Sequence, residues 1–175
     1  TKTEVIARAK RVKKDSIYNK IELMIIDEIS MVRADLFDYI DIFLRTARKN
    51  KLPFGGVQLC LVGDLFQLPP IVTENEKAFF NDNYSSHYFF GTEVFQDMFF
   101  QLRCLELDTV YRQSDSQFIN VLNAIRENKL SEEHYEFLND RVTDVENDED
   151  YVTIVATNRS ADKINSDNLN KLDTK

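Results

Sequence analysis

Cysteine, glycine, proline and tryptophan are all scarce in this chain of 175 residues, which has two, four, three and none of them respectively. Two cysteines are too few for a disulfide scaffold. Both Cys60 and Cys104 lie in apolar, strand-like runs, so we predict buried, reduced thiols. No apolar run approaches the length of a membrane-spanning helix, and the first residues lack the features of a secretory signal. We therefore expect no membrane contact and an intracellular, cytoplasmic protein, or a nuclear or mitochondrial one in a eukaryote.

Basic residues are also fewer than acidic ones. The chain has 22 Lys and Arg residues and 30 Asp and Glu residues, which gives a net charge of −8. A negative surface opposes non-specific attraction to a phosphate backbone, so any grip on nucleic acid must be local. Much of the acidic excess lies in residues 144–150, which we predict to be a solvated loop. The length suits one full domain, or one domain with part of another.

Hydrophobic spacing predicts an α/β fold with a parallel sheet flanked by helices. The order strand, helix, strand over residues 23–62 implies a parallel pair. Residues 71–101 are aromatic and irregular, and we predict that most of these rings pack in the core rather than stack on bases. The expected helices cover residues 4–14, 35–48, 115–128, 131–139 and 160–172, and the expected strands cover 23–26, 57–62, 102–107 and 151–156.

Acidic residues follow the first of these strands directly. Asp27 and Glu28 come after four apolar residues, and ligands of parallel sheets bind beyond the carboxyl ends of the strands. A nucleotide-hydrolysing site of the P-loop class needs one acid there that holds Mg²⁺ through water. It also needs a neighbouring acid that polarises the attacking water. Asp27 and Glu28 suit these two roles, although any buried strand that ends in a solvated acid pair has the same pattern.

The second strand ends in Gly63 and Asp64, and Gln67, Pro69 and Pro70 follow. An amide at Gln67 would sense a terminal phosphate, and the carboxylate of Asp64 would support the metal or its water. Taken alone, Asp64 fits a turn capped by its own side chain. Its occurrence together with the first acid pair favours the functional interpretation.

Two other classes of function remain open. In the first, Asp27, Glu28 and Asp64 form a carboxylate cage for two metal ions in a nuclease. Gln67 and the net charge of −8 count against it. In the second, the chain is a non-catalytic interaction module that has kept a motor-like fold.

Four segments together resemble the Pif-type and RecD-like DNA helicases of superfamily 1B, which are ATP-driven motors that move 5′ to 3′. The segments extend from residue 23 to about residue 165 and so cover most of the chain. They are LMIIDEISMV at 23–32, GGVQLCLVGDLFQLPP at 55–70, YRQ at 111–113 with residues 118–126, and ATNR at 156–159 with residues 164–165.

The resemblance implies a role for each candidate residue. Asp27 would be the Mg²⁺-associated acid of a Walker B strand, and Glu28 the base that orients the hydrolytic water. Gln67 would couple the terminal phosphate to DNA movement, and Asp64 would lie at the same nucleotide site. Arg112 would be an arginine finger that neutralises charge during phosphoryl transfer.

The resemblance also implies a RecA-like P-loop NTPase fold. Residues 1–104 would form the C-terminal part of a first motor domain, and residues 105–175 the beginning of a second. The expected cofactors are ATP and Mg²⁺, and the expected partner of a monomer is single-stranded or forked DNA. DNA repair, recombination and replication are all compatible with such a motor.

The sequence departs from the family pattern at the phosphate-binding loop. It contains no G-x-x-x-x-G-K-[ST] motif, which supplies the amides and the lysine that hold the phosphates. In this family the motif precedes the first acidic strand. We therefore expect the chain to be an internal piece of a longer protein, and expect the piece alone neither to bind ATP tightly nor to unwind DNA.

Overall fold

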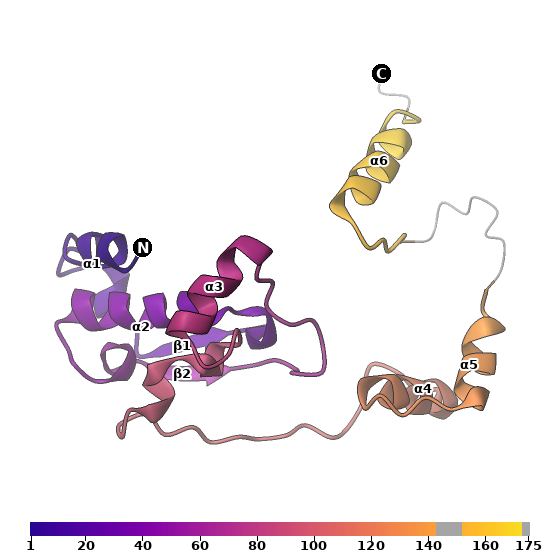
Figure 1. Ribbon diagram of the computed structural model, residues 1–175, viewed down its shortest axis with the longest axis horizontal. Helices are drawn as coiled ribbons and strands as arrows, with labels where there is room; N and C mark the ends of the chain where they lie inside the picture. Colours follow the sequence, from indigo (N-terminus) through magenta and orange to yellow (C-terminus); the bar gives the residue numbers. More distant parts are fainter. Residues whose placement is uncertain (143–151, 173–175) are drawn as a thin grey trace. The chain divides into compact units, whose positions relative to one another are not determined.

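The computed structural model describes residues 1–142 and 152–172. The chain divides into two compact units, Thr1–Leu130 and Ser131–Lys175, whose elements are labelled in Figure 1. The predicted acidic loop at 144–150 lies outside the described residues. Within them, no helix is both long enough and apolar enough to cross a bilayer.

The first unit contains two strands and four α-helices, joined by turns and short 3₁₀ helices. These elements are α1 (Lys2–Ala9), η1 (Ile17–Asn19), β1 (Leu23–Ile26), η2 (Ile29–Met31), α2 (Ala34–Arg48), η3 (Pro53–Gly56), β2 (Gln58–Leu61), α3 (Glu74–Asn83), η4 (Phe89–Gly91), η5 (Glu93–Gln96) and α4 (Ser116–Arg126). The second unit contains α5 (Glu132–Asn139) and α6 (Asn158–Leu169). All five predicted helices are present, although α1 ends at Ala9 rather than continuing to Lys14.

The two strands form the parallel pair that the sequence predicts, with Leu23 opposite Gln58 and Ile26 opposite Leu61. Because side chains alternate between the two faces of a strand, Met24 and Ile26 pack against the core. Cys60 lies on the other face of β2 and is exposed, as is Cys104. The prediction of two buried thiols is therefore wrong. Cys60 is exposed because β2 faces the core on one side only, and Cys104 is exposed because its segment forms no strand.

The strands predicted at 102–107 and 151–156 are not formed over the residues that the structure describes. Leu105 and Leu107 are each 93% exposed. An apolar run becomes a strand only when a neighbouring strand accepts and donates its backbone hydrogen bonds. In the described part of the chain, the one sheet pairs β1 with β2.

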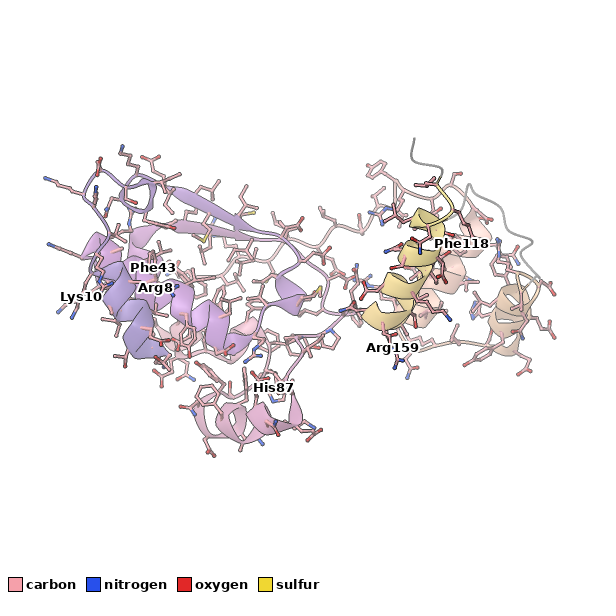
Figure 2. All side chains as sticks on the ribbon, turned by 90° about the horizontal axis from the view of Figure 1, so that it is seen from above. Arg8, Lys10, Phe43, His87, Phe118 and Arg159 are labelled. Carbon is pink, nitrogen blue, oxygen red and sulfur yellow. The ribbon has the colours of Figure 1, made fainter. Side chains whose placement is uncertain are left out.

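Aromatic rings from α2 and from the region after β2 fill the core. Phe37 is fully buried, and its ring centroid lies 5.0 Å from Phe54, 5.6 Å from Phe89 and 6.0 Å from Phe95. His87 is a packing residue beside α3 (Figure 2), with its ring 5.3 Å from that of Phe80. Of the aromatic side chains in residues 71–101, Phe80 and Phe89 are buried and Phe95 and Phe100 pack against the core, whereas Phe79, Phe90 and Phe99 are exposed. Core packing is therefore the use of some of these rings and not of most.

Helix α3 lies in the stretch predicted to be irregular, residues 71–101, so that prediction is wrong for Glu74–Asn83. A capping box opens α3, because the Glu76 carboxylate accepts hydrogen bonds from the backbone and hydroxyl of Thr73 at 3.0 and 2.7 Å. Arg33 pairs with Glu76 at 2.9 Å. The bonds from Thr73, followed by the one from Arg33, lower the pKa of Glu76 to about 2. The Thr-x-x-Glu spacing is the sequence signal for this helix start.

We expect Phe37→Ala to lower the free energy of unfolding by about 3–5 kcal/mol, because it leaves a cavity among three other rings. Leu36→Ala is the matched control, since Leu36 is the preceding residue of α2 and is 50% exposed. Urea denaturation followed by circular dichroism measures both variants. Equal losses in the two variants would contradict this account of the core.

Candidate functional site

The acid pair sits in a strained turn directly after β1. Asp27 and Glu28 are both exposed, and the Asp27 carboxylate accepts a hydrogen bond from the Glu28 amide at 2.9 Å. Glu28 adopts a left-handed backbone conformation with φ of 52°, which costs a residue with a side chain about 1–2 kcal/mol. Strain of this kind tends to cluster at functional sites. The turn places both carboxylates at the carboxyl edge of the sheet, as predicted.

Backbone hydrogen bonds tie this turn to the end of β2. The Val62 amide donates to the Ile26 carbonyl at 2.9 Å, and the Val62 carbonyl accepts from the Ile29 amide at 2.9 Å. Asp27 and Glu28 lie between these two bonds. The acid pair is thus held beside the segment that leads through Gly63 to Asp64.

The segment after β2 passes so close to Ile29 that only glycine fits at position 63. A Cβ atom at this position would lie 2.9 Å from the Ile29 Cγ2 atom and 3.0 Å from the Ile29 nitrogen. Both distances are shorter than ordinary van der Waals contact. The absence of a side chain at Gly63 is what allows the two strand ends to pack together.

Asp64 closes the turn after β2 with its own side chain. Its Oδ1 atom accepts from the Phe66 amide at 3.0 Å, and its Oδ2 atom accepts from the Gln67 side-chain amide at 3.3 Å. The Gln67 backbone amide donates to the Asp64 carbonyl at 3.1 Å. The structure therefore contains the side-chain-capped turn that the sequence left as the alternative interpretation of Asp64, and this turn also orients Gln67.

A cavity of about 320 Å³ adjoins this turn. Asp64 and Gln67 line it from one side, and residues of the coil and helix that follow line it from the other. The latter are Leu107, Val110, Ile119, Leu122, Asn123 and Arg126. Arg126 Nε lies 3.4 Å from Asp64 Oδ2. Arg126 is not among the site residues predicted from the sequence, although its segment is among those that carry the resemblance.

Arg112 is not brought to this cavity. It is exposed in the coil before α4 and is not one of the lining residues. The structure thus groups Asp64 with Gln67 and sets the acid pair beside them at the strand ends.

Two kinds of metal site were predicted: a carboxylate cage for two metal ions, and a single Mg²⁺ held by Asp27 through water. The arrangement of the acidic side chains fits the second kind and not the first. Within residues 1–142 and 152–172, no group of three or more His, Cys, Asp or Glu side chains is arranged to hold a metal ion. This geometry counts against the carboxylate cage of a nuclease. Mg²⁺ in nucleotide sites is bound by one or two carboxylates with water and phosphate oxygens, and the exposed carboxylate of Asp27 fits that arrangement.

A family model and individual related proteins match this chain, and all of them are PIF1-like helicases. The family model of PIF1-like helicases matches residues 1–136. The ATP-dependent DNA helicase Pif1 of Campylobacter jejuni is 34% identical over 171 residues, which cover 95% of this chain and 36% of that protein. The human ATP-dependent DNA helicase PIF1 is 40% identical over 114 residues, covering 63% of this chain and 16% of that protein. The chain thus spans about a third or less of these relatives.

Solved structures of the same family share the fold. A Bacteroides Pif1 helicase in complex with ADP-AlF3 and ssDNA superposes with a TM-score of 0.81 at 38% identity, over 91% of this chain and 37% of that one. Pif1 helicase from Candida albicans gives 0.79 at 27% identity, over 100% of this chain and 38% of that one. These likenesses confirm the predicted α/β, RecA-like fold.

We expect Gly63→Ala to separate the two strand ends and to destabilise the fold by about 1–3 kcal/mol, because the added methyl group overpacks the contact with Ile29. Hydrogen exchange measures the effect directly, since the Ile29 amide donates across this contact and should exchange faster. Cys60→Ala is the control, because Cys60 is exposed on β2, shortly before Gly63 in the chain. Unchanged protection of Ile29 in Gly63→Ala would contradict the packing argument.

Proposed function

The chain belongs to the PIF1-like helicase family, and we propose that the whole protein is an ATP-dependent DNA helicase whose hydrolytic site includes the turns after β1 and β2. The match of the family model to residues 1–136 carries this proposal, because that range contains both turns and the Tyr-Arg-Gln segment. The hydrogen bonds through Val62, which hold the two turns together, give it a physical basis.

Asp27 and Glu28 divide the work at the first turn in this proposal. Asp27 would hold Mg²⁺ through water, and the ion, when bound, supplies positive charge against the phosphate oxygens. Glu28 would accept a hydrogen bond from the attacking water and orient it for in-line displacement. The left-handed turn suits this division, because it directs two consecutive carboxylates from one strand end into solvent.

Gln67 would face the terminal phosphate from the second turn. Its side-chain amide already donates to Asp64 at 3.3 Å, so a contact within the protein favours one orientation of Gln67 before any ligand arrives. Such preorganisation is how a side chain contributes to phosphoryl transfer without a large reorganisation cost. Asp64 would act at the same site mainly by holding Gln67.

We assign residues 1–104 to a first motor domain and residues 105–175 to the beginning of a second. On this assignment Arg112 comes from the second domain and reaches the nucleotide only when the two domains close on it. Its exposed position in the coil before α4 is compatible with that movement. Closure would then assemble the hydrolytic site, and opening would release the products.

DNA is the partner that this function requires. Structures of related Pif1 helicases contain ssDNA or forked dsDNA, and one describes two coordinating helicases. We propose single-stranded or forked DNA as the substrate, 5′-to-3′ movement, and a monomer as the working unit inside the cell. Repair, recombination or replication would use this activity.

We expect Glu28→Gln in the full-length protein to abolish Mg²⁺-dependent ATP hydrolysis while ATP binding persists, because the variant keeps the shape of the side chain and loses the base. Glu22→Gln is the matched control, since Glu22 is an exposed acid at the opposite end of β1. Phosphate release and nucleotide binding are measured in parallel.

Two results would replace the helicase proposal. DNA cleavage without ATP that is lost in Asp27→Ala would identify a nuclease. A full-length protein with neither ATP hydrolysis nor DNA cleavage would identify an interaction module with a motor-like fold.

We expect Arg112→Ala in the full-length protein to lower kcat by about 10³-fold, the effect typical of losing an arginine finger, with little change in ATP affinity. Arg103→Ala is the control, because Arg103 is exposed in the same coil and has no assigned role. Steady-state hydrolysis and equilibrium nucleotide binding separate the two effects. Equal losses of turnover and affinity would point to misfolding instead.

A further inference from the structure

Arg126, the last residue of α4, contacts the turn after β2 in two ways. Its Nε atom lies 3.4 Å from Asp64 Oδ2, and its Cζ atom lies 4.7 Å from the centroid of the Phe66 ring. A guanidinium group is planar, so its edge can face a carboxylate while its face lies on an aromatic ring. Arg126 therefore contacts two residues of the turn at once, the carboxylate of Asp64 and the ring of Phe66.

Asp64 links Arg126 to Gln67. Its Oδ2 atom accepts from the Gln67 side-chain amide at 3.3 Å and is also the oxygen that faces Arg126. A distance of 3.3 Å is long for an N–H···O hydrogen bond, so the position of this oxygen decides how well the amide is held. A change at Arg126 therefore reaches the Gln67 amide through a single shared atom.

The face of α4 that contains Arg126 also contributes to the cavity. Ile119, Leu122 and Arg126 all line it together with Asp64 and Gln67. Their spacing of three and four residues places them on one side of the helix. Helix α4 thus faces the turn across the cavity with two apolar side chains, and Arg126 at its end contacts the turn directly.

We propose that Arg126 is a positioning residue: by holding Asp64, it couples the position of α4 to the orientation of the Gln67 amide. Its consequence for turnover rests on the proposed function, in which that amide faces the terminal phosphate. A displacement of α4, for example when DNA binds, then changes how Gln67 presents its amide.

An ordinary surface ion pair is the competing explanation. The Arg126 and Asp64 side chains are 41% and 26% exposed, and pairs this exposed contribute little to stability. Removing Arg126 should therefore leave the protein folded. The deciding measurement is then coupling between DNA binding and hydrolysis, which a pair without a positioning role would not change.

The test compares ATP hydrolysis by full-length Arg126→Ala with and without a single-stranded oligothymidylate. We expect DNA-stimulated kcat to fall about five- to tenfold, a typical coupling between sites, and to fall by a larger factor than the DNA-free kcat, while the KM for ATP changes little. Arg126→Lys should recover only part of the stimulation, because it keeps the charge and loses the planar group.

Lys129→Ala is the matched control. Lys129 follows α4, is 74% exposed and pairs with Glu127 at 2.6 Å. This substitution removes the same charge as Arg126→Ala, so it has the same effect on non-specific attraction to DNA. Its DNA-stimulated rate should equal that of the wild type. An equal fall in Lys129→Ala, a fall in Arg126→Ala that is the same with and without DNA, or no fall at all would overturn the proposal.

Hydrogen exchange in the 175-residue chain tests the contact without any motor activity. The Phe66 and Gln67 amides donate to Asp64 at 3.0 and 3.1 Å, and both should exchange faster in Arg126→Ala. Unchanged exchange would show that Arg126 does not hold the turn. A wild-type protein without DNA-stimulated hydrolysis would refute the proposed function, and the exchange result would still decide whether Arg126 positions Asp64.

Discussion

Val62 is the residue on which the candidate site depends, because its amide and carbonyl both bond to the chain that leaves β1. Each such bond contributes only about 1 kcal/mol to stability. Together, however, they fix the register of the two strand ends, and a one-residue slip would turn every side chain to the opposite face. The position of the acid pair beside Gly63 and Asp64 follows from these two bonds.

The same constraint explains the strain at Glu28. The chain must leave β1, present the acid pair and return to donate from Ile29 to Val62 within three residues. A left-handed residue allows so tight a bend, and Glu28 adopts that conformation although its side chain makes it costly. Glycine would remove the cost and also the carboxylate. A glutamate at a position where glycine would cost less free energy is expected if its carboxylate has a function.

The hydrophobic spacing of the sequence correctly predicted the parts of the fold whose contacting elements are also close together in the chain. The strand–helix–strand unit from β1 to β2 and the acids that end each strand belong to this class. The predicted strand at 102–107 failed, because apolar residues do not show whether a partner strand lies beside them. The Arg126–Asp64 contact was missed for a related reason, since it joins residues far apart in the chain whose charges alone do not indicate pairing. The acid pair, Gln67 and Arg112 have predicted roles that depend on the nucleotide rather than on the fold.

The structural and functional interpretations of Asp64 are compatible. An ionised carboxylate offers about four acceptor positions, and at Asp64 two of them accept from the Phe66 amide and the Gln67 side-chain amide, while Arg126 forms an ion pair with Oδ2. Direct binding of a metal ion would place a second cation beside Arg126 or displace one of these partners. The geometry therefore favours a role in which Asp64 serves the site through the groups it holds. A motif can then require this aspartate for hydrolysis even though its carboxylate is already occupied by donors from its own chain.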